Sequence, residues 1–269
     1  MTKEFKGSKN NVAIGLASSE VIDRFGSANA EFLKGLRGVD YETGQVFERG
    51  LEGISNYNVN PEYAERNIKQ QAGFSAEVVK TSRDNAENII AGRPERTFRS
   101  EDVPGYGSNN TVSDHVVLDG NGQVIEHAQM KFVNDPNQLV DKIAGGSGGK
   151  NDLSRYLQND FIDLPTEQVE VAKEYAARQA ENFSEQADRA LRDGKEDLAK
   201  RLQQKADNYS EIKEKIRDTG ITSEEAVDYR LNPTWETAKD IGSISHRAGV
   251  EGAKLGAVIG GTISIATNA

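Results

Sequence analysis

The spacing of apolar residues changes several times along the chain and predicts a succession of helical and β segments. Between residues 61 and 91 apolar positions recur at helical spacing, and Pro61 stands at a favourable first helical position. This pattern predicts a helix, broken near Gly73. Gly92-Arg-Pro94 should end it, because glycine suits a C-terminal cap and proline disfavours helix at the residue before it. Residues 1–60 carry only short apolar runs, which indicate short helices or a loosely packed arm.

A hairpin is the clearest β signal. Residues 93–110 are rich in turn formers, and Val116-Val-Leu118 then precedes Asp119-Gly-Asn-Gly122 and the segment 123–132. Asp-Gly and Asn-Gly supply the positive φ that hairpin turns need, so this order predicts strand, tight turn, strand. The run Gly145–Gly149 predicts a flexible loop or boundary.

The next part of the chain predicts an antiparallel helical hairpin. Two long polar runs, Thr166–Leu191 and a second one ending at Arg217, are separated by Arg192-Asp-Gly194. Their apolar positions are mainly Ala, Leu and Ile, so the seam should be thin, and the charge pattern favours a solvated packing element. Thr222-Ser-Glu-Glu225 fits a capping box and should open a shorter helix.

The C-terminal segment is rich in glycine and alanine. Gly252, Gly256 and Gly260 recur every four residues, a spacing that lets helices approach closely. Residues 255–267 are apolar but fall short of the roughly 20 residues that span a bilayer. We expect a buried helix, an aggregation-prone end or a membrane-contacting segment, and an end at Ala269 suggests that a longer parent chain continues.

These patterns predict an α+β protein with a small sheet, flanking helices, a helical hairpin and C-terminal helices. The expected parts are an N-terminal arm (1–60), an α/β core (61–150), the hairpin with short helices (151–247) and the glycine-spaced tail (248–269). A length of 269 residues, 36% of them hydrophobic and 28% charged, suits a soluble, helix-rich globular protein. The net charge of −10 means that any nucleic-acid contact must be local.

Composition also narrows the chemistry. There are no cysteines, so disulfides, zinc–thiolate sites and thiol nucleophiles are excluded, and His115, His127 and His246 are not spaced as a ligand motif. A metal here would be a hard ion such as Mg²⁺ or Mn²⁺, held by carboxylates. No phosphate-binding loop, dinucleotide motif or Gly-x-Ser-x-Gly elbow is present. The polar N-terminus has no signal-peptide core, so a cytoplasmic protein is expected, with membrane association through 248–269 as an option.

One group of polar residues on the predicted hairpin could carry chemistry. Alternation along the second strand places His127, Gln129 and Lys131 on one face, and Asp114 lies fifteen residues before Gln129, at the start of the first strand. The hairpin should bring Asp114 close to Gln129 and Lys131. A carboxylate can hold a divalent cation, and a neighbouring lysine can orient water or stabilise charge on a phosphate.

Asp114 followed by Gln129-Met-Lys131 after a turn resembles the PD-(D/E)xK pattern of restriction-endonuclease-like nucleases in its Gln-x-Lys variant. The resemblance covers roughly residues 67–135 and extends to nuclease-like modules of mobile elements and bacterial conflict systems. It departs at two positions: Ser113 stands where the family name has proline, and Gln129 replaces an acidic residue, which removes one charge from the metal shell.

The resemblance implies a restriction-endonuclease-like sheet and a metal-dependent nuclease. It implies that Glu77, in a Gly-Phe-Ser-Ala-Glu helix, Asp114 and Gln129 hold Mg²⁺ or Mn²⁺. Asp114, Gln129 and Lys131 would then form the catalytic set, with Lys131 assisting attack on a phosphodiester. The hypothesis to be weighed against it is an ordinary amphipathic hairpin with a solvated polar face.

Three neighbouring arginines could bind nucleic acid. Arg93, Arg96 and Arg99 lie close together in sequence and could contact phosphate bidentately, and His127 could touch substrate. The alternative is that these are ordinary surface charges. Two rival functions stay open: a membrane-interacting or partner-binding effector that uses the glycine-spaced helix, and a phage or plasmid assembly protein that oligomerises through the helical hairpin.

Overall fold

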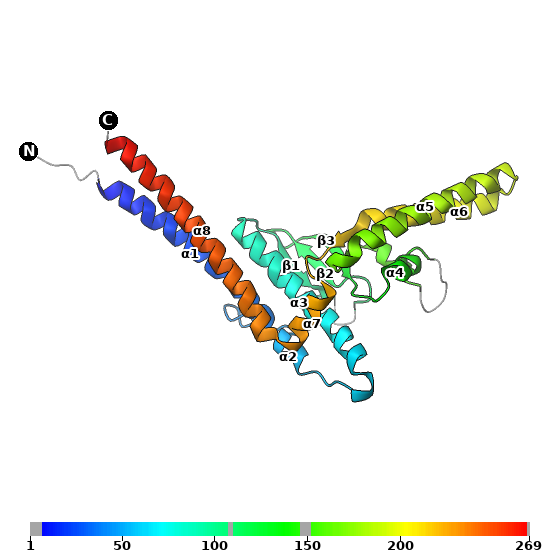
Figure 1. The fold of residues 1–269 in the computed structure, drawn as a ribbon, viewed down its shortest axis with the longest axis horizontal. Helices are drawn as coiled ribbons and strands as arrows, with labels where there is room; N and C mark the ends of the chain where they lie inside the picture. Colours follow the sequence, from blue (N-terminus) through cyan, green and yellow to red (C-terminus); the bar gives the residue numbers. More distant parts are fainter. Residues whose placement is uncertain (1–6, 107–109, 146–151, 268–269) are drawn as a thin grey trace, which may run out of the picture.

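A computed structural model describes residues 7–106, 110–145 and 152–267, with the side chains of 19–254 within those ranges. It is an α+β fold with one five-stranded mixed sheet flanked by helices, as the sequence predicts (Figure 1). The strands are β1 (Arg96–Arg99), β2 (His115–Leu118), β3 (Val124–Met130), β4 (Phe161–Leu164) and β5 (Ile216–Asp218), in that spatial order. β1 to β3 are antiparallel, and β4 and β5 continue the sheet parallel to β3.

The predicted hairpin is confirmed as β2 and β3. Oδ1 of Asp119 accepts hydrogen bonds of 2.8 Å from the amides of Asn121 and Gln123, and Gly122 has a φ of +79°. The turn sets Leu118 opposite Val124, and a bulge between Val117 and Leu118 then shifts the register by one residue, so that His115 lies opposite Ala128.

Two strands lie where the sequence suggested other structure. β1 forms within the turn-rich stretch 93–110, where Asn85 supports it by accepting a 2.8 Å hydrogen bond from the Thr97 amide. The second run of the hairpin, expected to remain helical to Arg217, ends at Lys215, because Ile216 pairs with Ile162 in the sheet and is buried. In each place a tertiary contact overrides the local pattern.

Helix α3 (Ala64–Ile90) follows a short 3₁₀ turn, Pro61–Tyr63, and passes through Gly73 without interruption. The expected break near Gly73 is therefore wrong. Glycine inside a helix costs only about 1 kcal/mol, which the burial of neighbouring Ala72 and Ala76 outweighs. The predicted end is confirmed, with Gly92 at a φ of +66° after the helix.

The N-terminal part is one long helix, α1 (Gly7–Arg37), and short α2 (Leu51–Ser55) follows; the expectation of short helices or a loose arm is wrong for residues 7–37. Val21, Phe25, Ala28 and Phe32 recur every three or four residues and are buried. They pack in one cluster with residues of α3 and of α8 (Pro233–Thr267). Glycine and serine between these positions hide the pattern in the sequence.

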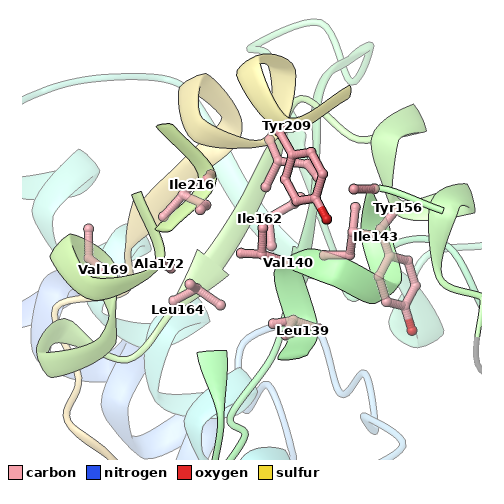
Figure 2. Packing of buried hydrophobic residues seen from close by; sticks show 13 residues of the cluster. Leu139, Val140, Ile143, Tyr156, Ile162, Leu164, Val169, Ala172, Tyr209 and Ile216 are labelled. Atoms are coloured by element: carbon pink, nitrogen blue, oxygen red, sulfur yellow. The ribbon is translucent and has the colours of Figure 1, made fainter. Parts of the chain in front are cut away.

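Helices cover the sheet on two sides. On one side α4 (Pro136–Ile143), α5 (Val169–Arg192) and α6 (Glu196–Lys215) pack on β4 and β5 (Figure 2). On the other, α2, α3 and α7 (Ser223–Leu231) share a cluster with Met130 of β3. Short 3₁₀ turns occupy Ser100–Asp102, Ser154–Gln158 and Thr166–Gln168.

The helical hairpin is confirmed as α5 and α6, which extend away from the sheet (Figure 1). Its seam is thin as expected, since the buried residues far from the sheet are alanines such as Ala187, Ala190 and Ala199. Gly194, with a φ of +72°, lies at the turn. One half of the predicted capping box is confirmed, because Oγ1 of Thr222 accepts a 3.0 Å hydrogen bond from the Glu225 amide, whereas the Glu225 carboxylate accepts a hydrogen bond from Arg83 at 2.6 Å.

The tail continues α8, which lies beside α1, so that the start of α1 and the end of α8 lie at the same extremity (Figure 1). Among the residues that the structure describes, none would lie within 4 Å of a Cβ on Gly252. Gly256 and Gly260, and Gly146–Gly149 of the predicted loop, lie outside the residues whose surroundings are described. No helix in the described part of the chain is long and apolar enough to span a membrane.

Candidate metal centre at the end of the hairpin

Asp114 directly precedes β2 and is held rigidly by its backbone. Its amide donates a 2.9 Å hydrogen bond to the Ala128 carbonyl, and its own carbonyl accepts one of 2.8 Å from the Ser100 amide. The residues before it are fixed by buried Asn159, which donates to the Val112 carbonyl at 2.8 Å and accepts from Ser113 Oγ at 2.7 Å. Ser113, which stands at the proline position of the family pattern, thus helps to place the aspartate.

Three donors converge on one oxygen of Asp114. Oδ2 accepts hydrogen bonds from Nε2 of Gln129, from the Met130 amide at 3.0 Å and from Nζ of Lys131 at 3.4 Å. Gln129 is fully buried, whereas the side chains of Asp114 and Lys131 are 19% and 27% exposed. The structure therefore brings Asp114, Gln129 and Lys131 together, at a place that solvent can reach.

Glu77 joins this group from helix α3. Nε2 of buried His115 donates a 3.0 Å hydrogen bond to the Glu77 carbonyl and ties the helix to the start of β2. Burial, and next the nearby Asp114 carboxylate, raise the pKa of Glu77 to about 8, although Lys131 and Arg49 oppose the rise. The negative charge of an ionised Glu77 is therefore poorly balanced by its surroundings, and a bound cation would stabilise it.

Arg49 is a member of the site that sequence reasoning missed. Its Nη1 lies 3.7 Å from Oε2 of Glu77 and its Nη2 lies 3.1 Å from Oε2 of Glu101, while its guanidinium lies over the Phe74 ring at 4.2 Å from the centroid. Arg49 belongs to the loop between α1 and α2, with no motif around it, so only the tertiary fold reveals its position.

The arginines predicted to grip phosphate are not gathered at Asp114. Arg99 is buried: its Nε donates to Oδ2 of Asp102 at 2.9 Å and its Nη2 donates to the Arg49 carbonyl at 2.7 Å. Arg96 lies opposite Leu118, about 10 Å along the strand from Arg99, which lies opposite His115.

The side chains of Arg93 and Arg96 form hydrogen bonds with residues near them in sequence, and not with Glu77 or Asp114. Nη1 of Arg96 donates to the Arg93 carbonyl at 2.7 Å, and Nε of Arg93 donates to Oδ1 of Asn88 at 2.8 Å. These two side chains thus lie at the far end of β1.

His127 lies on β3 two residues before Gln129. Its Nε2 is 2.9 Å from the hydroxyl of Tyr106, and its amide donates to Oδ2 of Asp160 at 2.8 Å. The exposed side of the strand therefore carries a Tyr106–His127 pair about 7 Å from Gln129, a distance that one nucleotide could bridge.

The donor set suits a hard divalent ion. Glu77 and Asp114 offer carboxylates and Gln129 an amide, and Mg²⁺ is commonly held by one or two carboxylates together with water. No cluster of three or more His, Cys, Asp or Glu with metal-binding geometry occurs among the residues described. An ion held by these three side chains alone would complete its coordination with water.

Comparison with known proteins adds no relative: no family model, no curated protein and no solved structure matches this chain.

Proposed function

We propose that this protein is a metal-dependent nuclease-type domain of the PD-(D/E)xK, restriction-endonuclease-like kind, which acts on nucleic-acid phosphodiesters with Mg²⁺ or Mn²⁺. The observation that carries the proposal is the convergence of Gln129 and Lys131 on a single oxygen of Asp114, with Glu77 beside them on α3. These four residues are the set that the Gln-x-Lys pattern implies. The mixed sheet covered by helices is compatible with the fold of that family.

Each side chain has a role that follows from its position. The carboxylates of Glu77 and Asp114 would hold the ion, and half a turn of the Gln129 amide would offer Oε1 in place of Nε2. When bound, the ion lowers the pKa of a water ligand and offsets charge on the phosphate. Lys131, whose ammonium is 3.4 Å from Asp114, can hold the attacking water or stabilise the developing charge.

Local cations can offset the acidic net charge at this place. The Lys131 ammonium lies 5.1 Å from the Tyr156 ring centroid, and the Arg155 guanidinium lies 4.8 Å from the same centroid. Nε of Arg155 donates to the Thr111 carbonyl at 2.9 Å, three residues before Asp114. In this proposal Arg155, rather than the Arg93–Arg99 group, contacts the phosphate next to the scissile one.

The test is cleavage of plasmid DNA and of RNA by purified protein with Mg²⁺ or Mn²⁺. Asp114→Asn and Lys131→Ala should each lower the cleavage rate about 100-fold or more, because each removes a group aimed at the reacting phosphate or its ion. Lys200→Ala, on the far α6, is the matched charge control and should cleave at the wild-type rate. Cleavage that survives Asp114→Asn, or no cleavage of either nucleic acid, would overturn the proposal.

A further inference from the structure

We infer that Arg49 competes with the metal ion: its guanidinium lies between Glu77 and Glu101 when the ion is absent and must move aside when a divalent ion binds. This inference rests on the proposed function and concerns the regulation of the same site. It assigns Arg49 the part of a positioning residue that sets the affinity for metal.

The geometry of the Arg49 side chain supports this role. Its two terminal nitrogens face different carboxylates, at 3.7 Å from Glu77 and 3.1 Å from Glu101. The longer distance, to Glu77, exceeds that of a direct hydrogen bond, so the pairing with the candidate ligand is electrostatic and readily exchanged. The side chain is 23% exposed and so can move into solvent.

The backbone of Arg49, in contrast, is fixed. Arg99 donates to its carbonyl at 2.7 Å, and the amide of Glu48 donates to Oδ1 of Asp102 at 2.8 Å. On the other side Gly50 packs against Gly38 so closely that a Cβ on Gly38 would lie 3.0 Å from the Gly50 nitrogen. Only the side chain of Arg49 can therefore move when a metal ion binds. The buried Arg99 holds the backbone of Arg49 in place.

Arg49 and a divalent ion compete for Glu77 because both are positively charged. Arginine does not lose its proton in proteins, so Arg49 cannot yield to a dication by becoming neutral. Two cations next to Glu77 repel each other, and the guanidinium has to swing away from the carboxylate. Phe74, over which it already lies at 4.2 Å, offers a pivot, and a released guanidinium beside the ion can grip phosphate bidentately.

A purely structural ion pair predicts a different result. If Arg49 only stabilised the loop, its replacement would lower stability and leave metal affinity unchanged or weaker. If it competes with the ion, its replacement by a neutral residue must tighten metal binding. The sign of the change in affinity separates the two roles.

The experiment is titration calorimetry of the full chain with MnCl₂, without nucleic acid. Arg49→Met should bind Mn²⁺ at least about five-fold more tightly than wild type, within the usual range of coupling between sites. Arg49→Gln, which keeps polar contacts but not the charge, should tighten binding similarly and serves if the methionine variant does not fold. Arg37→Met removes the exposed pair with Glu52 from the same region and should bind as wild type does.

The outcomes distinguish the inference from the proposal beneath it. Mn²⁺ binding that Asp114→Asn abolishes, together with unchanged or weaker binding by both Arg49 variants, would overturn only the role of Arg49. No binding by wild type or by either Arg49 variant would overturn the metal site itself, and the inference with it.

Discussion

The backbone amide of Met130 donates a 3.0 Å hydrogen bond to Oδ2 of Asp114, so the middle residue of the Gln-x-Lys segment holds the aspartate through its main chain. Its side chain meanwhile packs in the cluster between β3, α3 and α7. Met130 thus connects the hydrophobic core to Asp114.

Removal of the Asp114 carboxylate should therefore destabilise the protein. Asp114→Ala leaves the backbone amide of Met130 without its acceptor and leaves Nε2 of buried Gln129 only the Met130 carbonyl at 3.3 Å, which costs about 1–3 kcal/mol and lowers Tm by several degrees. Asp114→Asn keeps an oxygen and should cost less. Thermal unfolding followed by circular dichroism checks this, and equal Tm values for wild type and Asp114→Ala would contradict it.

Stability of the metal-free protein should depend on pH through Glu77. Burial and the Asp114 charge raise its pKa from 4.5 to about 8 in the folded state. Between these values the folded protein binds more protons than the unfolded chain, so the free energy of unfolding falls as pH rises from about 4.5 to 8.

Glu77→Gln should remove this decline. Its Tm should exceed that of wild type increasingly from pH 5 to pH 8 in the presence of EDTA and stay higher by a constant amount above pH 8. Glu185→Gln, at an exposed position of α5, is the control and should follow the wild-type curve. Parallel curves for wild type and Glu77→Gln would refute the shifted pKa.

Divalent ions should stabilise the fold through the same carboxylates. With Mn²⁺ at 100 times its Kd, binding adds about 2.7 kcal/mol to the free energy of unfolding, which corresponds to a rise in Tm of about 5–10 °C. EDTA should reverse the rise, and Asp114→Asn should show none. A Tm that Mn²⁺ leaves unchanged in the wild type would argue against the site.

Gly35 should contribute to the stability of the packing of α1 on α3. A Cβ at this position would collide with Oγ of Ser82 and lie 3.2 Å from Cγ1 of Val78. Gly35→Ala should therefore destabilise the protein by about 1–3 kcal/mol. Adding Ser82→Ala should restore most of the loss, because the Cβ of residue 82 is 3.6 Å away.

Gly26 provides the matched control in the same helix. A Cβ there meets nothing within 4 Å, so Gly26→Ala should leave stability unchanged or raise it by up to about 1 kcal/mol through helix propensity. Chemical denaturation of the three variants tests the pair of expectations. A stable Gly35→Ala variant would show that α1 can move away from α3 at little cost.

The sequence was sufficient for features that depend on near neighbours. Asp114 could be placed near Gln129 because the Asp-Gly-Asn-Gly turn joins the two strands, although the exact register also depends on the bulge between Val117 and Leu118. The break at Gly194 could be placed because the chain must reverse there. The helical hairpin followed from two long runs with one interruption. In these places local geometry alone determines which residues meet.

Features that depend on distant partners were not predictable in this way. β1 has four residues and exists because Asn85 and β2 bind it, and Arg49 reaches Glu77 from a loop twenty-eight positions earlier in the chain. The sequence pattern predicts a phosphate contact for Arg99 although the residue is buried, because sequence does not show that Asp102 and the Arg49 carbonyl occupy its donors. Charged residues near each other in sequence need not share a surface.

The hairpin α5–α6 leaves β4 and returns to β5, two strands that lie side by side, with Ile162 opposite Ile216. The length of the hairpin is therefore independent of the geometry of the sheet, because both of its ends are fixed at neighbouring strands. Inserting seven residues in each helix would carry the tip about 10 Å further out without displacing either strand. A longer or shorter hairpin would therefore change only the distance between the tip and Asp114, and the positions of Asp114 and Gln129 would stay the same.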